Sequence, residues 1–341
     1  MTATPAAPKI NRQRATPTLK KVIRRSIPDP LWNGLRDAKS AVTAAISDRP
    51  LRREVRRLLD DRDAAVPLRS DLDLLLKLHD AFDGRQFGNS YDGDVILPVA
   101  RERFDLLRSR GIDLAGRDLV EYGAGHGAML FVADEVGARR AVAIDYDAVD
   151  FEKLRAEHGD PTVDHEFVAA DLCDYAPPAG AFDVALCDNA FEHFADPAVV
   201  LDKIHTTLRP GGVLLARFNP IFHSALGGHR YWLTAVPWVQ TIFDDETNWR
   251  FFQDHLRLSE STNLYTGEAI TDRDPFPEMN RWRPGQYEAI FLDGAKWQPV
   301  RWTRQSDRRQ AWFAELFMPE VPELTRADWF TSGYEFLLRK V

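Results

Sequence analysis

Residues 119–127, Leu-Val-Glu-Tyr-Gly-Ala-Gly-His-Gly, decide the fold. A short apolar run reaches Glu121 and then opens into three glycines, Gly123, Gly125 and Gly127. This pattern predicts a buried parallel strand that turns tightly into a helix beneath a nucleotide-like ligand. The first two glycines and Ala128 also satisfy the G-x-G-x-x-G/A pattern of dinucleotide-binding enzymes, so the glycines alone do not identify the ligand.

Glu121 separates the two kinds of ligand. It stands two residues before the first glycine, where its carboxylate would lie beside a dinucleotide phosphate and repel it. A ligand with an ammonium group would instead be attracted. S-adenosylmethionine carries an ammonium and a sulfonium and no phosphate, so we favour it over a dinucleotide. A nicotinamide oxidoreductase is the alternative.

Further predicted strands end in polar residues at the same edge of the sheet. Residues 141–145 form an apolar strand that ends in Asp145, which is suited to accept hydrogen bonds from two ribose hydroxyls. Residues 167–172 predict a third strand, after which the Asp171 carboxylate and the Leu172 amide would read the adenine edge. Residues 182–187 predict a fourth strand. It delivers Asp188 and Asn189, and a turn over residues 208–212 then leads into a strand over 213–218.

These motifs together resemble those of class I S-adenosylmethionine-dependent methyltransferases that modify small molecules, lipids and sugars. The motifs are Val-Glu-Tyr-Gly-Ala-Gly-His-Gly, Ile-Asp, Ala-Asp-Leu, Phe-Asp-Val-Ala-Leu-Cys-Asp-Asn-Ala-Phe-Glu-His and Leu-Arg-Pro-Gly-Gly, in the family's order across residues 117–219. The resemblance implies an α/β fold, a Rossmann-like seven-stranded sheet with helices on both faces, and S-adenosyl-L-methionine as cofactor. The expected cofactor-binding residues are Glu121, Gly123, Ala124, Gly125, Gly127, Asp145, Tyr146, Asp171, Leu172, Asp188 and Asn189.

Composition describes a chain that can bury a core. Of its 341 residues 44% are hydrophobic, yet no run of about 18 uncharged apolar residues exists, which argues against a membrane span. Nothing in the sequence looks like a signal peptide. Cys173 and Cys187 both stand beside predicted strand ends, where free thiols are commoner than a disulfide. We therefore expect a cytoplasmic protein.

Charge is spread unevenly along the chain. Residues 1–60 hold 14 Lys or Arg against 5 Asp or Glu, whereas the whole chain has a net charge of −8. This basic beginning would suit peripheral contact with an anionic membrane, a nucleic acid or an acidic partner. The favoured alternative is a solvated, partly disordered tail followed by a charged helix. The acidic remainder of the chain argues against nucleic acid.

The chain is expected to have five parts. Residues 1–28 read as a flexible basic arm, residues 29–116 as an N-terminal helical cap or lid with Gln86 and Tyr91 as lid candidates, and residues 117–219 as the cofactor-binding core. Residues 220–282 are an aromatic-rich insertion after the fifth strand, which would cover the substrate mouth. Residues 283–341 complete the core with a helix over 283–293 and strands over 299–304 and 332–338, which the resemblance implies to be antiparallel.

Three histidines are candidates for chemistry. Methyl transfer to a hydroxyl needs a positioned acceptor and a group that takes its proton, and histidine suits that task near neutral pH. His193 follows the fourth strand, and His223 and His229 follow the fifth. The alternative for each is a structural histidine in a loop or against the sheet.

Glu192 and His193 together with His223 or His229 also have the makings of a divalent metal site. Glu192-His193 is similar to part of the Glu-x-x-Glu-His metal signature of quinone-precursor O-methyltransferases and of methyltransferases that act on RNA 3′ ends. Asn189 stands here in place of the first Glu of that signature.

The sequence therefore predicts a methyltransferase that uses S-adenosylmethionine and modifies a hydroxyl oxygen on a saccharide, lipid-linked or natural-product acceptor. The alternatives are an RNA methyltransferase and a non-catalytic scaffold that binds the cofactor and docks a membrane or a partner. The sequence leaves the oligomeric state open.

Overall fold

The computed structural model describes residues 48–82, 93–175, 177–230, 233–255 and 273–341. The predicted arm over residues 1–28, the lid candidates Gln86 and Tyr91, and part of the aromatic insertion lie outside the described residues. The chain divides into two compact units, Met1–Pro50 and Leu51–Val341, and the second contains every element discussed below except the first two residues of the helix Arg49–Asp61.

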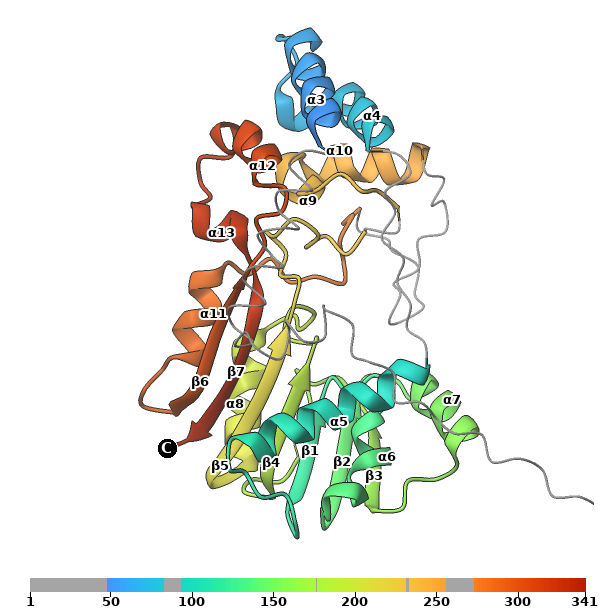
Figure 1. Ribbon diagram of the computed structural model, residues 1–341, viewed down its shortest axis with the longest axis vertical. Helices are drawn as coiled ribbons and strands as arrows, with labels where there is room; N and C mark the ends of the chain where they lie inside the picture. Colours follow the sequence, from blue (N-terminus) through green and yellow to red (C-terminus); the bar gives the residue numbers. More distant parts are fainter. Residues whose placement is uncertain (1–47, 83–92, 176, 231–232, 256–272) are drawn as a thin grey trace, which may run out of the picture. The chain divides into compact units, whose positions relative to one another are not determined.

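A seven-stranded sheet forms the centre of the second unit, with the strand order β3-β2-β1-β4-β5-β7-β6 (Figure 1). The first five strands run parallel, and β7 lies antiparallel to both β5 and β6. The predicted α/β fold and the antiparallel pairing of the last two strands are confirmed. The strands are β1 Asp118–Tyr122, β2 Arg140–Asp145, β3 Asp164–Ala169, β4 Phe182–Asp188, β5 Leu208–Phe218, β6 Trp297–Ser306 and β7 Thr331–Lys340.

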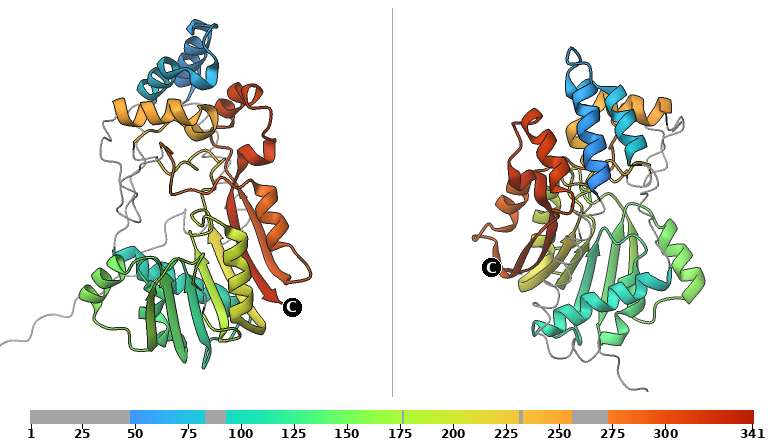
Figure 2. Two further views of the ribbon diagram at one scale, coloured as in Figure 1. Left: turned by 180° about the vertical axis from the view of Figure 1, so that it is seen from behind. Right: turned by 45° about the horizontal axis from the view of Figure 1, so that its top comes forward.

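Helices cover both faces of this sheet. Helices α5, α6 and α7 share one apolar cluster with one face, and α8 and α11 share another cluster with the opposite face (Figures 1 and 2). The alternation of side chains along each strand explains this, because neighbouring residues such as Leu119 and Val120 enter different clusters. The helices are α3 Arg49–Asp61, α4 Leu72–Ala81, α5 Gly93–Ser109, α6 Ala128–Val132, α7 Val149–His158, α8 Pro197–Thr207, α9 Val239–Ile242, α10 Asp245–Arg250, α11 Pro284–Phe291, α12 Ala311–Phe317 and α13 Arg326–Phe330.

A third apolar cluster joins three segments that are far apart in the sequence. It combines α3 and α4 with the described part of the insertion and with α12 and α13. The Phe82 and Phe313 rings meet edge to face with centroids 5.3 Å apart, and the Trp238 and Trp329 centroids are 5.8 Å apart. The N-terminal helices and the insertion therefore share one core.

Two strand boundaries differ from the prediction. The strand predicted over 167–172 is wrong in its bounds, since β3 ends at Ala169 and residues 172–174 form a turn. The turn predicted over 208–212 is also wrong, because β5 already begins at Leu208. Leu208 pairs with Phe182 and Val213 pairs with Val184, so residues 209–212 bulge opposite one residue of β4.

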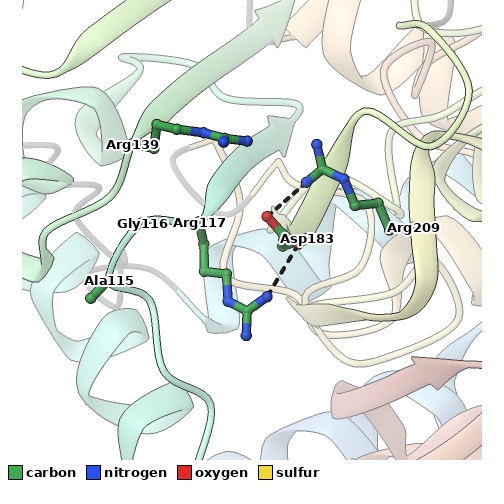
Figure 3. Close-up of a pocket in the computed structure, with 6 residues that line it drawn as sticks. All are labelled: Ala115, Gly116, Arg117, Arg139, Asp183 and Arg209. Carbon is green, nitrogen blue, oxygen red and sulfur yellow. Dashed lines mark hydrogen bonds and ion pairs between the residues drawn. The ribbon is translucent and has the colours of Figure 1, made fainter.

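Arginines and aspartates tie the amino ends of four strands together around a pocket (Figure 3). Arg209 in the bulge of β5 donates to Asp183 at 2.7 Å and to Asp118 at 2.8 Å. Arg139, just before β2, also donates to Asp118 through Nε at 2.8 Å. These ion pairs hold the pKa of Asp118 below its usual range, chiefly through the hydrogen bond from Arg139. The pocket lies at the sheet edge opposite the strand-end acids and serves the fold.

Two expectations from composition can be compared with the structure. No helix in the described ranges is long and apolar enough to cross a membrane. Cys187 is buried, Cys173 is partly exposed, and both thiols are free, as predicted.

Candidate functional site

The glycine turn connects β1 to α6 with all three glycines in the left-handed region of backbone conformation. Gly123 has a φ of 68°, and a Cβ placed on it would lie 2.3 Å from the Cβ of Ala190. Around Gly125, by contrast, a Cβ would meet no atom within 4 Å. The turn therefore packs tightly against the loop after β4 at its first glycine and opens at its second, where a ligand can approach the backbone.

Glu121 lies near the end of β1 with an incompletely satisfied carboxyl group. Burial raises its pKa to about 8, the nearby Asp188 adds to the rise, and Arg103 opposes it. The Met129 N–H hydrogen bonds to this carboxyl. Within the described part of the chain, no group donates a hydrogen bond to the buried Oε2 atom. A buried acceptor of this kind invites a cationic donor.

Asp145 ends β2 and holds the glycine turn in place. Its Oδ2 accepts the Gly125 N–H at 2.7 Å, and its Oδ1 accepts the Tyr146 N–H at 2.8 Å. Burial raises the pKa of Asp145, and these two hydrogen bonds oppose the rise. Because a carboxylate has about four acceptor positions, it can still accept bonds from a diol.

Asp188 at the end of β4 lies between two arginines that the sequence analysis missed. Arg103 of α5 donates to its Oδ2, and Arg217 of β5 donates to its Oδ1 at 3.3 Å. The Arg103 side chain is only 10% exposed. The signal was available, since Arg103 lies beside buried Phe104 and four residues before buried Leu107 on one helix stripe. A charged residue on an apolar stripe indicates a specific partner.

The remaining predicted cofactor residues lie in the turns that follow their strands. Asp171 is exposed, and its Oδ1 accepts the Cys173 N–H at 2.7 Å, while Leu172 is buried. Asn189 has a φ of 49°, and its N–H donates to the Arg217 carbonyl at 2.6 Å. These turns follow β3 and β4 at the carboxyl edge of the sheet, where Glu121 and Asp145 also lie.

Glu192, His193 and His229 come together beyond the end of β4. One potential metal-binding atom from each lies within 4.8 Å of the others. Glu192 is fully buried, and among the described residues neither carboxylate oxygen has a hydrogen bond of normal geometry. Burial raises the pKa of Glu192 to about 8, and the N–H groups of Glu192 and Asn219 oppose this rise. The sequence analysis offered His223 or His229 as the second imidazole, and the structure brings His229 next to Glu192 and His193.

The hydrogen bonds of the two imidazoles define their tautomers. His193 Nδ1 lies 2.7 Å from the Glu278 carbonyl oxygen, and His229 Nε2 lies 3.1 Å from the Pro220 carbonyl oxygen. A carbonyl can only accept, so these two nitrogens carry the protons. The neutral rings therefore have their lone pairs on His193 Nε2 and His229 Nδ1. Burial lowers the pKa of His193 and lowers that of His229 to about 3, so both rings are neutral at neutral pH.

His223 is separate from this triplet. Its Nε2 lies 3.3 Å from the Arg281 carbonyl oxygen, and burial lowers its pKa to about 4. Its ring packs edge to face against Phe222 with centroids 5.2 Å apart. These contacts describe a histidine that joins two loops of the insertion.

The triplet has the donor set of a metal centre. Metal-binding histidines usually donate their second ring N–H to a carbonyl or carboxylate, and both His193 and His229 do so. Two imidazoles and one carboxylate suit a borderline divalent ion. The two oxygens of buried Glu192 have no hydrogen-bond partner among the described residues, and they would provide negative charge to such an ion once it displaced the carboxyl proton. The residues present therefore fit a divalent metal.

The last residues of the predicted insertion hold the Glu192 segment in place through Asn280. The Asn280 N–H donates to the Glu192 carbonyl at 2.9 Å. The Asn280 side-chain Nδ2 donates to the Phe191 and Phe194 carbonyls at 2.7 and 3.0 Å. Its Oδ1 accepts from the Tyr287 hydroxyl at 2.6 Å. Except for Tyr287, these partners lie more than 80 residues from Asn280 in the chain, so no local sequence pattern could reveal them.

Comparison with known proteins finds a methyltransferase family and curated O-methyltransferases among its matches. The family profile described as a methyltransferase domain matches residues 120–216. A ubiquinone biosynthesis O-methyltransferase of Thiobacillus denitrificans is 33% identical over 141 residues, which cover 38% of this chain and 60% of that protein. The protein of the same name from Ralstonia nicotianae is 32% identical over 142 residues, covering 40% and 58%. The matches thus span about three-fifths of these relatives.

A solved structure gives a further match. It is a putative S-adenosylmethionine-dependent methyltransferase from Listeria monocytogenes, with 15% sequence identity and a TM-score of 0.43. The match covers 71% of this chain and 99% of that one.

Proposed function

We propose a function from one premise: this chain carries a class I S-adenosylmethionine-dependent methyltransferase domain, by its motifs, its strand order and its family match. The proposed reaction transfers the methyl group of S-adenosylmethionine to a hydroxyl oxygen of a small-molecule acceptor. One observation carries the proposal. The Glu121 carboxyl group at the end of β1 has a buried oxygen that lacks a donor among the described residues, and it interacts electrostatically with the buried guanidinium of Arg103 from α5. A zwitterionic amino acid requires this combination of an acid and a base.

The two charges of the methionine end find opposite charges in this chain. Glu121 would accept the ammonium through the buried Oε2 atom that lacks a donor among the described residues. Arg103 would donate to the methionine carboxylate, because its fork keeps donor positions beyond the one that it gives to Asp188. Asp145 would accept the ribose hydroxyls, and Asp171 and Leu172 would read the adenine.

His193 is the proposed base. Its Nε2 carries the lone pair, and the lowered pKa keeps the ring neutral, which is the form that accepts a proton. His229 lies next to it, with ring centroids 5.0 Å apart. The base would take the hydroxyl proton as the acceptor oxygen attacks the sulfonium methyl in line, which leaves S-adenosylhomocysteine.

Glu192, His193 and His229 would hold a divalent metal, which supplies positive charge that acidifies a bound hydroxyl. In that state His193 would serve as a ligand and not as the base, and a weaker base would be enough to take the proton of the acidified hydroxyl. Titration of Mg²⁺, Mn²⁺ or Zn²⁺ into chelator-treated protein distinguishes the two arrangements. Turnover should rise if the triplet holds a metal, and it should stay unchanged if His193 acts as the base without a metal.

The acceptor is proposed to be a saccharide, a lipid-linked molecule or another natural product with a free hydroxyl. The names of the two relatives, ubiquinone biosynthesis O-methyltransferases, support oxygen as the methylated atom. Aromatic side chains of the insertion and Trp282, which packs beside Tyr287 at 5.4 Å between centroids, would suit a ring-shaped acceptor. An RNA acceptor and a non-catalytic scaffold are the competing functions.

The test begins with cofactor binding and then turns to acceptors. Calorimetry is expected to show S-adenosylmethionine binding that Asp145→Asn weakens, because Asn presents one acceptor oxygen in place of two. Asp160→Asn, at a side chain that is 78% exposed, is the matched control. Hydroxyl acceptors from the three classes, with RNA included, are then screened for release of S-adenosylhomocysteine. Binding without release across all classes would favour the scaffold.

His193→Gln separates chemistry from binding. Loss of a general base lowers turnover by roughly 10²–10⁴-fold with cofactor affinity retained. His158→Gln, at an exposed position on α7, is the control and keeps full activity. Undiminished turnover of His193→Gln would remove this residue from the mechanism.

A further inference from the structure

A buried ion pair joins the loop that carries His229 to the segment whose backbone accepts a hydrogen bond from His193. Arg230 Nη2 donates to Glu278 Oε2 at 2.8 Å and Nη1 donates to Oε1 at 3.4 Å. The two side chains are 9% and 3% exposed. Arg230 also donates from Nε to the Pro275 carbonyl at 3.1 Å. The pair thus has bidentate geometry and a further bond to the same segment.

Each partner of this pair is directly connected to one imidazole. Arg230 follows His229 in the chain, and the Glu278 carbonyl accepts the His193 Nδ1–H. A closed ring results: His193 is bonded to Glu278, Glu278 is paired with Arg230, Arg230 is peptide-bonded to His229, and the His229 ring is 5.0 Å from the His193 ring. A displacement of either ion-pair partner would move one imidazole relative to the other.

The backbone around His229 depends on this anchor. His229 has a φ of 50°, a conformation that L residues adopt only when their surroundings impose it. A Cβ on Gly227 would lie 2.1 Å from the Ile221 carbonyl oxygen, so the loop is already packed against backbone. Two contacts therefore hold the loop in place: the close packing of Gly227 against the Ile221 carbonyl and the ion pair of Arg230.

Stability alone does not explain a buried ion pair at this position. Removing two charges from water costs several kcal/mol per ion, and apolar residues of similar volume often give equal or greater stability. The contribution that apolar residues cannot supply is geometric, since a bidentate pair fixes both distance and orientation.

We propose that Arg230 and Glu278 are a positioning pair that sets the separation of His193 and His229 and the tautomer of His193. The catalytic purpose of this positioning rests on the proposed function, whereas the effect of the ion pair on the two imidazoles can be measured without it. The Nδ1–H form of His193 is the less favoured tautomer of a free histidine. The Glu278 carbonyl selects it, and the ion pair keeps that carbonyl in place.

The first measurement uses ¹⁵N-histidine NMR on the full chain at pH 7.5, without acceptor. The wild-type protein is expected to show His193 as the pure Nδ1–H tautomer and His229 as the Nε2–H tautomer. In Glu278→Gln the carbonyl is retained and the ion pair is lost, so the His193 signals should become an average of both tautomers. The double variant Arg230→Met with Glu278→Met, which leaves no unpaired charge, should show the same averaging.

Asp118→Asn is the matched control. It weakens the ion pairs of a buried aspartate with partly exposed arginines at the opposite edge of the sheet, so it should lower the melting temperature and leave the His193 tautomer pure. A pure Nδ1–H tautomer in both Glu278 variants would overturn the proposal. Averaging in the control as well would also overturn it, because general loosening would then explain the effect.

Turnover tests the consequence separately. Loss of residues that orient a site typically costs roughly 10–100-fold in activity, so kcat should fall by that factor in Glu278→Gln while KM for S-adenosylmethionine stays within about twofold. Averaged tautomers with wild-type kcat would support the positioning pair and contradict the role of His193 in the proposed reaction. The two ideas can therefore fail independently.

Discussion

Glu121→Gln tests how cofactor binding depends on a buried acid. In the cofactor-free protein burial raises the pKa of Glu121 to about 8, so at pH 7 most molecules carry it protonated. An ammonium group needs the ionised form, and the proton must leave when the cofactor binds. The dissociation constant should therefore rise about elevenfold from its limiting value at pH 7 and about 100-fold at pH 6.

The cofactor's own amino group limits affinity on the alkaline side. An α-amino group has a pKa of roughly 7.7–8.0, and its neutral form lacks the charge that Glu121 binds. Affinity should thus be greatest near pH 8 and decline on both sides. At pH 7 the two groups together hold nearly two protons before binding and one afterwards, so about 0.8 proton should be released.

The Gln variant should lose the acidic dependence and part of the affinity. A hydrogen bond to a charged group contributes about 1.5–3 kcal/mol, which corresponds to roughly 10–150-fold in affinity above pH 8. This deficit should shrink as the pH falls and vanish or reverse at pH 6, where the wild-type protein must first ionise Glu121 and loses about 100-fold in affinity. Glu157→Gln, at an exposed position on α7, should behave as the wild type.

Calorimetry from pH 6 to 9, in buffers of different ionisation enthalpy, measures affinity and proton release together. An acidic limb that persists in Glu121→Gln would refute the assignment, as would equal affinity of both proteins at pH 8. Stability provides a second check on the cofactor-free protein. A raised carboxyl pKa makes the fold lose stability as pH rises from about 4.5 to 8, so Glu121→Gln should be stabilised relative to wild type at pH 8 by at most about 4 kcal/mol and little at pH 5.

The fold itself supports further predictions. Gly227→Ala should lower the melting temperature strongly, because its Cβ would lie 2.1 Å from the Ile221 carbonyl oxygen, whereas Gly285→Ala in α11 meets no atom within 4 Å and should be neutral or stabilising. Asp118→Asn should cost about 1–2 kcal/mol in urea unfolding at pH 7, since it weakens hydrogen bonds from two arginines that are themselves partly exposed. The lowered pKa of Asp118 means that its contribution exists above the ordinary pKa near 4 and is lost as pH falls through the lower folded value, which unfolding at pH 2–4 measures. Glu192→Gln should abolish any stimulation of turnover by divalent metal, and stimulation that survives this change would place the ion elsewhere.

The sequence determined the core of this protein because its signals are local. Parallel strands that meet a ligand at one edge of the sheet require a strand that ends near Glu121, glycines with positive φ and acids at strand ends. All of these residues lie within about 100 positions of one another in the sequence. The predicted bounds of two strands were wrong because the residues at their ends have both turn-like and strand-like features. Residues 170–172 continued the hydrophobic pattern of β3 but turn away, and residues 209–212 looked like a turn but bulge within β5.

Only tertiary structure decided which distant residues complete the site. Arg103 reaches Asp188 across 85 residues, and Glu278 reaches His193 across the same separation. No local pattern shows which of two loop histidines joins Glu192, and it is the backbone conformation at residues 227–230 that brings His229 there and leaves His223 in a loop contact. Strand-end acids are placed by the topology of the sheet, whereas the partners of a histidine are placed by packing between segments far apart in the chain.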